Sequence, residues 1–516
     1  MSAEPLLLAG VDIGSTHCKA LLCDASGTVV ARAQRRTPRG RDGHSHPADD
    51  VIAAGLGALA DCVRAAGRSP EAVGLTGMAE AGVALDAAGR PLGPVQAWSD
   101  PTPGPYADRL SGTHGATALH RRTGVLPSAK VPLAKWCAMA DLAPGTLARM
   151  RTWAGAADLV AHALTGHVGT DATFAQRTMA WDPARACWIP ELLAEAGIGP
   201  ERMPPVHRAG RPVGPVTAAS AATTGLRPGA PVVVAGHDHL VGAWAAGVRG
   251  AGQVADSMGT AEAVLTVSAG APDTVAAAGE GMSWGRHVDA THWITLAGMQ
   301  ASGALVEWFC DRFLGLPGTS GPERYAAFAQ LIDTVPAAPT GLVVEPYLHG
   351  RSSPRPSPGA GLAIHGLRPA HGPAHLARAL LEGAAHHARW MTDTQAVLAG
   401  LAPAAVTLLG GSTRIRAWTE LKAAVSPWPT LLCGEPEAPG LGAAAWAGAA
   451  LGLDPVTVCA PTTDLVPDPA AADAYRTHHR ERFLPRVTAT PPLNSPLNDV
   501  PNDIPRDVPN DKEHPA

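Results

Sequence analysis

The sequence predicts an α/β fold built from two large domains. Two short motifs carry most of this prediction, residues 12–16 (DIGST) and residues 256–260 (DSMGT), in which a tight glycine turn joins two apolar strands. They start nearly half of the chain apart, which indicates a duplicated architecture with one hairpin in each half. A strongly apolar strand at residues 231–235 is followed at once by a helix, an order typical of α/β proteins. The length of 516 residues leaves room for two such domains.

Apolar runs and helical spacing predict the elements of the first half. Residues 49–67 have apolar side chains on one face, which predicts an amphipathic helix with Asp49 as its cap. Residues 147–164 are expected to be mostly helical, and a short apolar helix is expected at residues 240–247. The expected strands are residues 6–13, 18–23, 28–32, 73–76, 83–86 and 231–235.

The second half repeats the order of strand, glycine turn and strand before it becomes mostly helical. The expected strands are residues 252–260, 263–267 and 406–409, and the expected helices are residues 298–313, 374–398, 418–425 and 441–451. From about Arg486 the chain repeats proline with asparagine and aspartate, a pattern that blocks helix and sheet. The sequence therefore predicts an N-terminal domain over residues 1–248, a C-terminal domain over residues 249–485 and a disordered tail over residues 486–516.

Composition excludes several classes of protein. Charged residues make up only 16% of the chain, against a usual ~25%, and the formal net charge is −5, so we expect no basic surface for nucleic acid or for a membrane. The eight cysteines show no C-x-x-C spacing, which argues against a zinc ribbon and for isolated thiols in a reducing compartment. The N-terminus lacks the basic segment of a signal peptide, and no stretch approaches about 20 apolar residues. We therefore expect a cytoplasmic protein.

The two glycine turns offer groups that bind phosphate. A tight turn of this kind exposes backbone N–H groups that can cradle phosphate oxygens, and nearby hydroxyls and a lysine add further donors. Asp12 could hold Mg²⁺ through water molecules, since this ion keeps much of its hydration shell. Neither the P-loop motif nor the G-x-G-x-x-G motif of dinucleotide-binding domains is present. The candidate phosphate ligands are Gly14, Ser15, Thr16, Lys19, Gly259 and Thr260.

Asp238 is the candidate catalytic carboxylate. It follows the buried strand at residues 231–235 and precedes a helix, which is where α/β proteins place reacting groups. A hydroxyl that accepts a phosphoryl group needs a nearby carboxylate to orient it and take its proton. The neighbours His237 and His239 leave three interpretations open: a metal site that lacks an obvious third ligand, hydrogen bonding around the acceptor, or no role.

Together these residues resemble the FGGY family of carbohydrate kinases, within the actin/hexokinase-like ATPase superfamily. The resemblance runs from about Leu6 to about Leu451 and rests on an ordered set of motifs, each of them weak alone. The matching segments are residues 12–19 (DIGSTHCK), 73–98, 236–238 (GHD), 256–260, 302–303 with Trp308, 345–350 (EPYLHG), 378–383 (RALLEG) and 410–411 with Trp418.

The resemblance implies two ribonuclease-H-like (actin-like ATPase) domains that flank a central cleft. It implies ATP and Mg²⁺ as cofactors, a small sugar, sugar acid or polyol as acceptor, and Asp238 as general base. It leaves a homodimer open. The implied acceptor contacts are Ala79, Glu80, Trp98, Asp100 and Asp238, and the implied nucleotide contacts beyond the two turns are Gly303, Gly410 and Gly411.

The chain departs from the usual family motifs around the acceptor. Many members have Gln-Met-His or Gln-Arg-Glu where this chain has Met78-Ala79-Glu80, and a carboxylate at Glu80 can accept hydrogen bonds from adjacent hydroxyls. The usual W-x-D-x-R pattern loses its arginine, because Thr102 stands in that place, and Ser412 replaces the third glycine of the adenosine motif. These departures leave the acceptor open, while the phosphate loops and the base are retained.

We therefore expect an ATP-dependent kinase that transfers the γ-phosphoryl group to a hydroxyl of a small carbohydrate or polyol. The alternatives are another actin-like ATPase or a catalytically inactive regulator that binds sugar or nucleotide. Activator ATPases of radical dehydratases need clustered cysteines, and regulators of the ROK type carry a helix-turn-helix head and a cysteine-rich zinc motif. The sequence shows neither feature.

Overall fold

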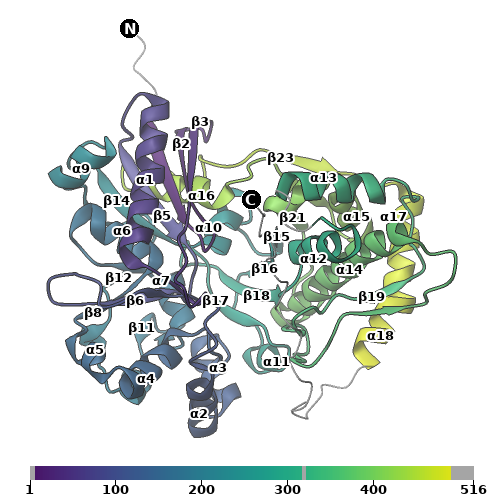
Figure 1. Cartoon of the computed structure of the whole chain (residues 1–516), viewed down its shortest axis with the longest axis horizontal. Coiled ribbons are helices and arrows are strands. Elements are labelled where there is room, and N and C mark those ends of the chain that lie inside the picture. Colours follow the sequence, from purple (N-terminus) through teal and green to yellow (C-terminus); the bar gives the residue numbers. More distant parts are fainter. Residues whose placement is uncertain (1–5, 317–320, 490–516) are drawn as a thin grey trace, which may run out of the picture.

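Two sheets of the same topology organise the protein, which we describe from a computed structural model for residues 6–316 and 321–489 (Figure 1). The strands of the first sheet are β1 (Leu7–Ile13), β2 (His17–Asp24), β3 (Val29–Arg36), β5 (Ala72–Gly77), β13 (Pro212–Pro215) and β14 (Pro231–His237). Those of the second sheet are β15 (Gln253–Met258), β16 (Glu262–Ser268), β17 (Ser283–Arg286), β18 (Trp293–Met299), β21 (Ala405–Leu409), β22 (Thr430–Cys433) and β23 (Thr462–Leu465).

The strand orders show the duplication directly. The first sheet, from its β3 edge, has the order β3-β2-β1-β5-β14-β13. The second sheet has the order β17-β18-β16-β15-β21-β22-β23, so its last six strands match those of the first and β17 is added at the edge. In the first, β1 is antiparallel to β2 and parallel to β5; in the second, β15 is antiparallel to β16 and parallel to β21. The two glycine turns therefore occupy equivalent places in two copies of one architecture, which confirms the predicted α/β fold.

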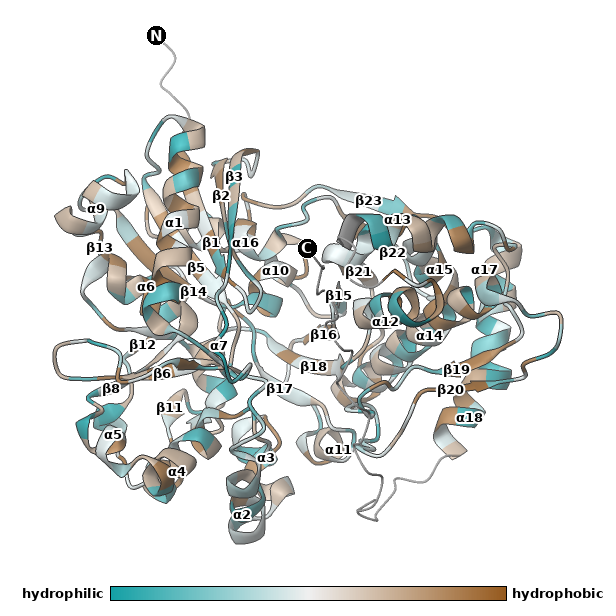
Figure 2. Ribbon diagram, in the orientation of Figure 1, coloured by the Kyte–Doolittle hydropathy of each residue, from teal (hydrophilic) through white to brown (hydrophobic). Residues whose placement is uncertain are grey.

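Helices cover both faces of the first sheet. One face packs against α1 (Ala48–Ala66) and α6 (Ala156–Thr165), and the other packs against α10 (Asp238–Ala245) and α16 (Ala438–Ala449). The helix α16 comes from the second half of the chain, yet it contacts β1, β2, β5 and β14 of the first sheet. Apolar side chains of α10 and α16 share one buried cluster with residues of both sheets, so this helix pair joins the two halves (Figure 2).

Glycines allow α16 to lie unusually close to the first sheet. A Cβ atom placed on Gly10 would lie 1.7 Å from the carbonyl oxygen of Gly440, and one on Gly74 would lie 1.9 Å from that of Ala443. On the helix itself, a Cβ atom at Gly442 would lie 2.1 Å from a carbonyl oxygen of α10. No side chain fits at these contacts, because real Cβ atoms do not approach carbonyl oxygens this closely.

A smaller four-stranded sheet lies next to the first sheet and carries residues 78–81 and 97–103. We call these two segments together the acceptor loop, because the implied acceptor contacts Ala79, Glu80, Trp98 and Asp100 lie in them. Its order is β4-β7-β6-β8, from β4 (Ser45–His46), β6 (Gly82–Leu85), β7 (Val95–Gln96) and β8 (Thr152–Gly155). The helices and short strands around it are α2 (Gly104–His114), α3 (Ala116–Thr123), α4 (Pro132–Leu142), α5 (Pro144–Arg149), α7 (Ala172–Ala175), α8 (Pro190–Leu193), β9 (Thr170–Asp171), β10 (Trp181–Asp182), β11 (Cys187–Trp188) and β12 (Val206–His207). The helix α9 (Ala218–Thr224) packs instead against α1 and α6 (Figure 1). The 3₁₀ turn η1 (Gln176–Thr178) follows α7 directly.

The second sheet packs mainly against the long helix α14 (Pro373–Ala399). The remaining elements of this half are α11 (Thr274–Gly279), α12 (Gly303–Phe313), α13 (Gly321–Ile332), α15 (Arg416–Val425), α17 (Pro469–His478), α18 (Leu484–Ala489), β19 (Val343–Glu345) and β20 (Ala363–His365). Among the helices of the described residues, none combines the length and the apolar character that crossing a membrane would require.

The structure corrects four expectations about local structure. Residues 147–164 are interrupted by β8, where Trp153 pairs with Ala84 of β6; such pairing overrides a weak helical propensity. Residues 298–302 precede α12 instead of belonging to it. Pro47, rather than Asp49, occupies the N-cap of α1. Arg486 lies in α18, and residues 490–516 of the predicted tail lie outside the described residues.

Candidate active site

Asp238 lies where β14 ends and α10 begins. Its Oδ1 atom accepts a 2.7 Å hydrogen bond from the backbone N–H of His239 and lies 3.2 Å from His237 Nε2. Burial raises the pKa of Asp238, and the nearby charge of Glu80 adds to the effect, although the bond from His239 opposes it. A carboxyl group with a raised pKa binds a proton more readily than an ordinary aspartate, which suits a base that takes a proton from a hydroxyl.

The two flanking histidines are neutral at neutral pH. Burial holds the pKa of His237 well below its usual range and lowers that of His239 to about 4, and Arg177 acts in the same direction on both. One ligand atom from each of His237, Asp238 and His239 lies within 4.8 Å of the others, so this group could hold a metal ion. A metal there would turn Asp238 into a ligand, which is incompatible with its use as a free base.

Asp12 is the last residue but one of β1 and lies close enough to Asp238 for their charges to interact. Burial raises its pKa, and the charge of Asp238 raises it further. Its Oδ1 atom is shielded from solvent and has no hydrogen-bond partner among the described residues. Lys19, opposite Asp12 on β2, is paired at 2.9 Å with Glu437 at the start of α16. A hard carboxylate oxygen without a partner fits Mg²⁺, and Asp12 is the residue that would hold it.

Glu80 meets Arg177 close to Asp238, and the charge of Glu80 adds to burial in raising the pKa of Asp238. Both Nε and Nη2 of Arg177 donate to a single oxygen, Glu80 Oε1, with Nε at 3.0 Å. Although burial raises the pKa of Glu80, the cations Arg177, Lys130 and Lys135 together hold it below its usual range. The carboxylate is therefore ionised, and its Oε2 atom accepts no hydrogen bond from the described residues.

Two lysines contact the two segments of the acceptor loop. The fully buried Lys135 donates to the backbone carbonyls of Glu80 at 2.6 Å and Ala97 at 2.7 Å. The ammonium group of Lys130 lies 5.2 Å from the ring centre of Trp98, within cation–π range. Trp98 and Glu80 thus belong to one cationic region, in which Lys135 holds the backbone of two acceptor-loop residues.

Residues 256–260, the second predicted phosphate loop, lie against Gly303 and Gly410, two other predicted nucleotide contacts. The N–H of Gly303 donates to the carbonyl of Gly259 at 2.9 Å, and the N–H of Ser302 donates to that of Thr260 at 3.0 Å. Gly410 adopts a positive φ of 98°, and a Cβ atom there would lie 2.7 Å from the carbonyl oxygen of Met258. The structure thus brings together Gly259, Thr260, Gly303 and Gly410, which are far apart in the sequence.

The two loop aspartates have different surroundings. Asp256 is buried and bonded at 2.5 Å to Lys422 Nζ, which also bonds Glu262 at 2.7 Å. A second oxygen of Glu262 accepts a 2.7 Å bond from Ser302 at the start of α12. The Oδ1 atoms of both Asp12 and Asp256 have no hydrogen-bond partner among the described residues. The two aspartates differ in their cations, because Lys422 compensates the charge of Asp256, whereas Lys19 next to Asp12 is paired with Glu437. The first motif is therefore the better candidate for Mg²⁺.

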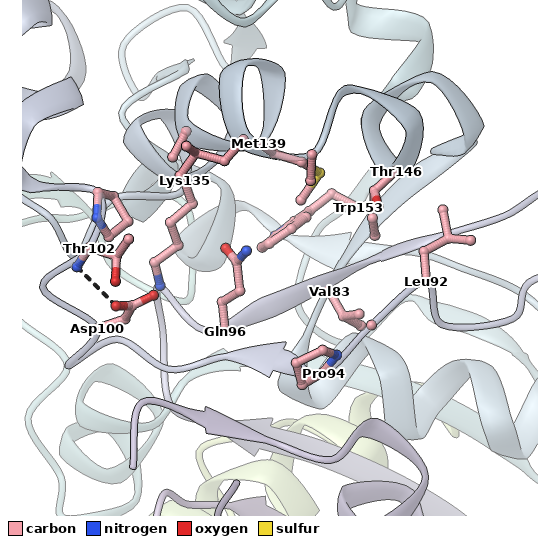
Figure 3. Close-up of a pocket in the computed structure, with 16 residues that line it drawn as sticks. Val83, Leu92, Pro94, Gln96, Asp100, Thr102, Lys135, Met139, Thr146 and Trp153 are labelled. Carbon is pink, nitrogen blue, oxygen red and sulfur yellow. Dashed lines mark hydrogen bonds between the residues drawn. The ribbon is translucent and has the colours of Figure 1, made fainter. Parts of the chain in front are cut away.

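The remaining predicted site residues divide into two groups. Gly14, Ser15 and Thr16 form the turn between β1 and β2, where Thr16 is exposed. Ala79 is buried next to Glu80. Asp100 instead lines a cavity behind the acceptor loop and accepts a bond from the backbone N–H of Thr102 (Figure 3). Gly411 follows Gly410 in a 3₁₀ turn.

Sequence reasoning missed the cations of this site, namely Arg177, Lys130 and Lys135. Arg177 and Glu80 are 97 residues apart in the sequence, and no sequence motif predicts a contact between such distant residues. Lysine is rare in the chain, and a lysine on the apolar helix α4 is the one signal that could have pointed to Lys135.

Comparison with known proteins agrees with this arrangement. Residues 7–245 match the N-terminal domain of the FGGY family of carbohydrate kinases, and residues 254–451 match its C-terminal domain. The xylulose kinase of Streptomyces coelicolor is 29% identical over 474 residues, which cover 87% of this chain and 89% of that protein. The Escherichia coli K12 xylulose kinase is 26% identical over 426 residues, which cover 81% and 84%.

Solved structures show the same fold. The xylulose kinase from Rhodospirillum rubrum has a TM-score of 0.81 at 29% identity and covers 94% of this chain and 98% of its own. The gluconate kinase from Lactobacillus acidophilus has a TM-score of 0.82 at 20% identity and covers 92% and 96%. The chain therefore belongs to the FGGY family of carbohydrate kinases, and it is an enzyme that uses ATP with Mg²⁺ to phosphorylate an alcohol group of a carbohydrate.

Proposed function

We propose that this kinase phosphorylates a neutral polyhydroxy acceptor, a ketose such as xylulose or a related polyol, with Asp238 as general base. The choice of a neutral acceptor rests on one observation. The guanidinium of Arg177 already forms an ion pair with Glu80 Oε1, beside Asp238. An acceptor with a carboxylate would lie beside two carboxylates that repel it, and Arg177, the cation that meets Glu80, already has an ion-pair partner.

The free oxygen of Glu80 supports the same acceptor. Because Arg177 bonds only Oε1, Oε2 remains able to accept a hydrogen bond from a hydroxyl. An uncharged molecule with neighbouring hydroxyls can bond this oxygen while another hydroxyl reaches Asp238. The names of three similar proteins, the xylulose kinases at 29%, 27% and 26% identity, point to such an acceptor.

Each part of the site has a task in this mechanism. Glu80 Oε2 orients the acceptor, and Asp238 takes the proton of the hydroxyl that attacks the γ-phosphorus in line. The N–H groups of Gly14 and Gly259 donate to carbonyls of their own turns, so other N–H groups of the two turns bind the phosphate oxygens. Mg²⁺, held through Asp12, would offset negative charge on those oxygens. Closure of the two domains over the bound substrates would exclude water that could otherwise accept the phosphoryl group.

We place the reaction in the cytoplasm. Six of the eight cysteines are buried, and all eight are unpaired thiols, as expected in a reducing compartment that also supplies ATP.

An ADP-release screen over neutral ketoses, polyols and aldonates tests the proposal. We expect a neutral ketose or polyol to give the highest kcat/KM, and we expect Asp238→Asn to lower kcat by at least ~10²-fold with nucleotide affinity nearly unchanged. A higher kcat/KM for an aldonate would refute the neutral acceptor. A kcat of Asp238→Asn close to that of the wild type would refute Asp238 as base, and ADP release that no acceptor stimulates would favour an inactive binding protein.

A further inference from the structure

A cavity lies behind the acceptor loop, between the small sheet and the helices α4 and α5. Its volume is about 240 Å³, and its walls come from β6, β7 and β8, from α4 and α5, and from the loop that holds Asp100 (Figure 3). Pockets for drug-sized ligands start at roughly 300 Å³, so this one suits a smaller molecule. The side chains of Glu80, Arg177 and Asp238 do not line it, which separates it from the acceptor site.

Three polar groups of this cavity have unused hydrogen-bonding capacity. Gln96 Oε1 is shielded from solvent and has no partner within the described part of the chain. Two of the three N–H groups of Lys135 donate to backbone carbonyls, and no described residue accepts a hydrogen bond from the third. Asp100 uses only Oδ1, for the backbone of Thr102. Figure 3 shows Gln96 between Lys135 and Trp153, with Asp100 next to the lysine.

The character of the cavity defines its ligand. The positive charge of Lys135 and the negative charge of Asp100 face each other, so neither an anion nor a cation is favoured. Leu92, Met139 and Trp153 form an apolar wall at the other end (Figure 3). An unpaired buried amide oxygen is costly, and a hydroxyl donor would satisfy it.

We propose that this cavity binds a small neutral molecule with a compact apolar body and two adjacent hydroxyls, and that the molecule acts on the acceptor loop through Lys135. Lys135 and Gln96 Oε1 are both shielded from solvent, so binding requires small side-chain movements that open them to the cavity. One hydroxyl then donates to Gln96 Oε1, and the other accepts the third N–H of Lys135 and donates to Asp100. Lys135 is a positioning residue, because the same ammonium group holds the backbone carbonyls of Glu80 and Ala97. A ligand that fixes this ammonium group therefore stabilises the loop that binds the acceptor.

The first experiment measures binding without turnover. trans-1,2-Cyclohexanediol is the probe and cyclohexanecarboxylate its charged counterpart, each followed by ligand-observed NMR with the full chain. We expect saturation transfer to the diol but not to the carboxylate, and no displacement by a saturating amount of the acceptor found in the ADP-release screen. The same signal should appear with Asp238→Asn, so this result does not depend on whether the proposed acceptor or base is right.

Two variants locate the binding site. Gln96→Leu removes the unpaired amide with little change in volume, and Thr146→Trp fills the cavity from α5 without touching Lys135. Both should keep the wild-type kcat and lose the diol signal. With wild type, saturating diol should lower the acceptor KM about fivefold or more at unchanged kcat, the usual size of a coupling between sites, and Thr146→Trp should abolish the shift. Equal diol signals in wild type and both variants, displacement by the acceptor, or an unchanged KM would overturn the proposal.

Discussion

Glu80 is held at the acceptor site by its backbone and by its side chain at the same time. Its φ of 65° lies in the left-handed region, which costs a non-glycine residue roughly 1–2 kcal/mol and needs support from the surroundings. Lys135 supports the backbone carbonyl, and Arg177 supports the carboxylate. This support keeps the free Oε2 atom of Glu80 in one orientation, as the proposed contact with a small acceptor requires.

Replacing that carboxylate should weaken the binding of the acceptor but not that of ATP. We expect Glu80→Gln to raise the acceptor KM by ~10- to 100-fold, because a hydrogen bond to a charged group is lost and Arg177 loses its ion pair. The KM for ATP should change little. Steady-state kinetics of both substrates provide the measurement, and Glu191→Gln, which breaks an exposed ion pair with Arg122, is the matched control. An unchanged acceptor KM would remove Glu80 from the site.

The raised pKa of Asp238 predicts the acid limb of the pH profile. A base must be deprotonated to act, so kcat should fall as the pH drops through a pKa well above 3.8, the ordinary aspartate value. Burial, then the charge of Glu80, raises this pKa, so Glu80→Gln should move the acid limb of kcat to lower pH. The kcat–pH profile at saturating acceptor tests the sign. An acid limb that stays in place or moves upward in Glu80→Gln would contradict the assigned coupling.

At this scale the sequence predicts the groups that stand in motifs and misses those that meet by folding. Asp12, Asp238 and the glycines of the turns occur in short local patterns whose chemistry can be read directly. Arg177 and Lys135 reach the site from elements whose positions depend on tertiary packing. Asp100 lies in the acceptor motif of the sequence, and the fold also places it at the cavity beside Lys135, which no motif indicates.

The helix α16 depends on glycine at its contacts with the first sheet. Gly10→Ala would place a methyl group 1.7 Å from the Gly440 carbonyl oxygen, and both partners are backbone that cannot rotate away. We expect the free energy of unfolding to fall by at least ~2 kcal/mol, within the usual range for overpacking. Denaturant unfolding followed by circular dichroism measures the loss.

A glycine with free space provides the control. A Cβ atom on Gly112 in α2 would meet nothing within 4 Å, so Gly112→Ala should leave stability unchanged or raise it by ~0.5–1 kcal/mol. If both substitutions have the same effect on the unfolding free energy, close packing of α16 does not explain the glycine at position 10.

Elements were predictable where one local signal dominated. Uninterrupted apolar runs correctly mark β1, β14 and β21, and helical spacing marks α1 and α14. The strand β8 was missed because it is four residues long and flanked by helix-forming segments. Its structure is decided by pairing with β6, which lies far away in the sequence.

At the scale of the whole molecule, the duplication was predictable, but the packing of α16, from the second half of the chain, against the first sheet was not. The spacing of the two glycine hairpins is visible in the sequence, and the two sheet orders bear it out. The helix α16 is apolar almost all round, which shows that it is buried but not against which sheet. The structure places it on the first sheet, where Glu437 also pairs with Lys19.

Because α16 comes from the second half of the chain, the first half by itself lacks a helix that covers its sheet. Without α16, the face of the first sheet formed by Leu8, Leu21 and Val233 would be exposed to water. We expect a fragment of residues 1–249 to bind the dye ANS and to unfold without a cooperative transition. The same fragment joined by a flexible linker to residues 434–466 should bind less ANS and unfold cooperatively, because the added segment restores α16 and its contact with α10. Cooperative unfolding of the shorter fragment without ANS binding would show that α16 covers a domain that folds without it, and would leave the helix only the role of joining the two halves.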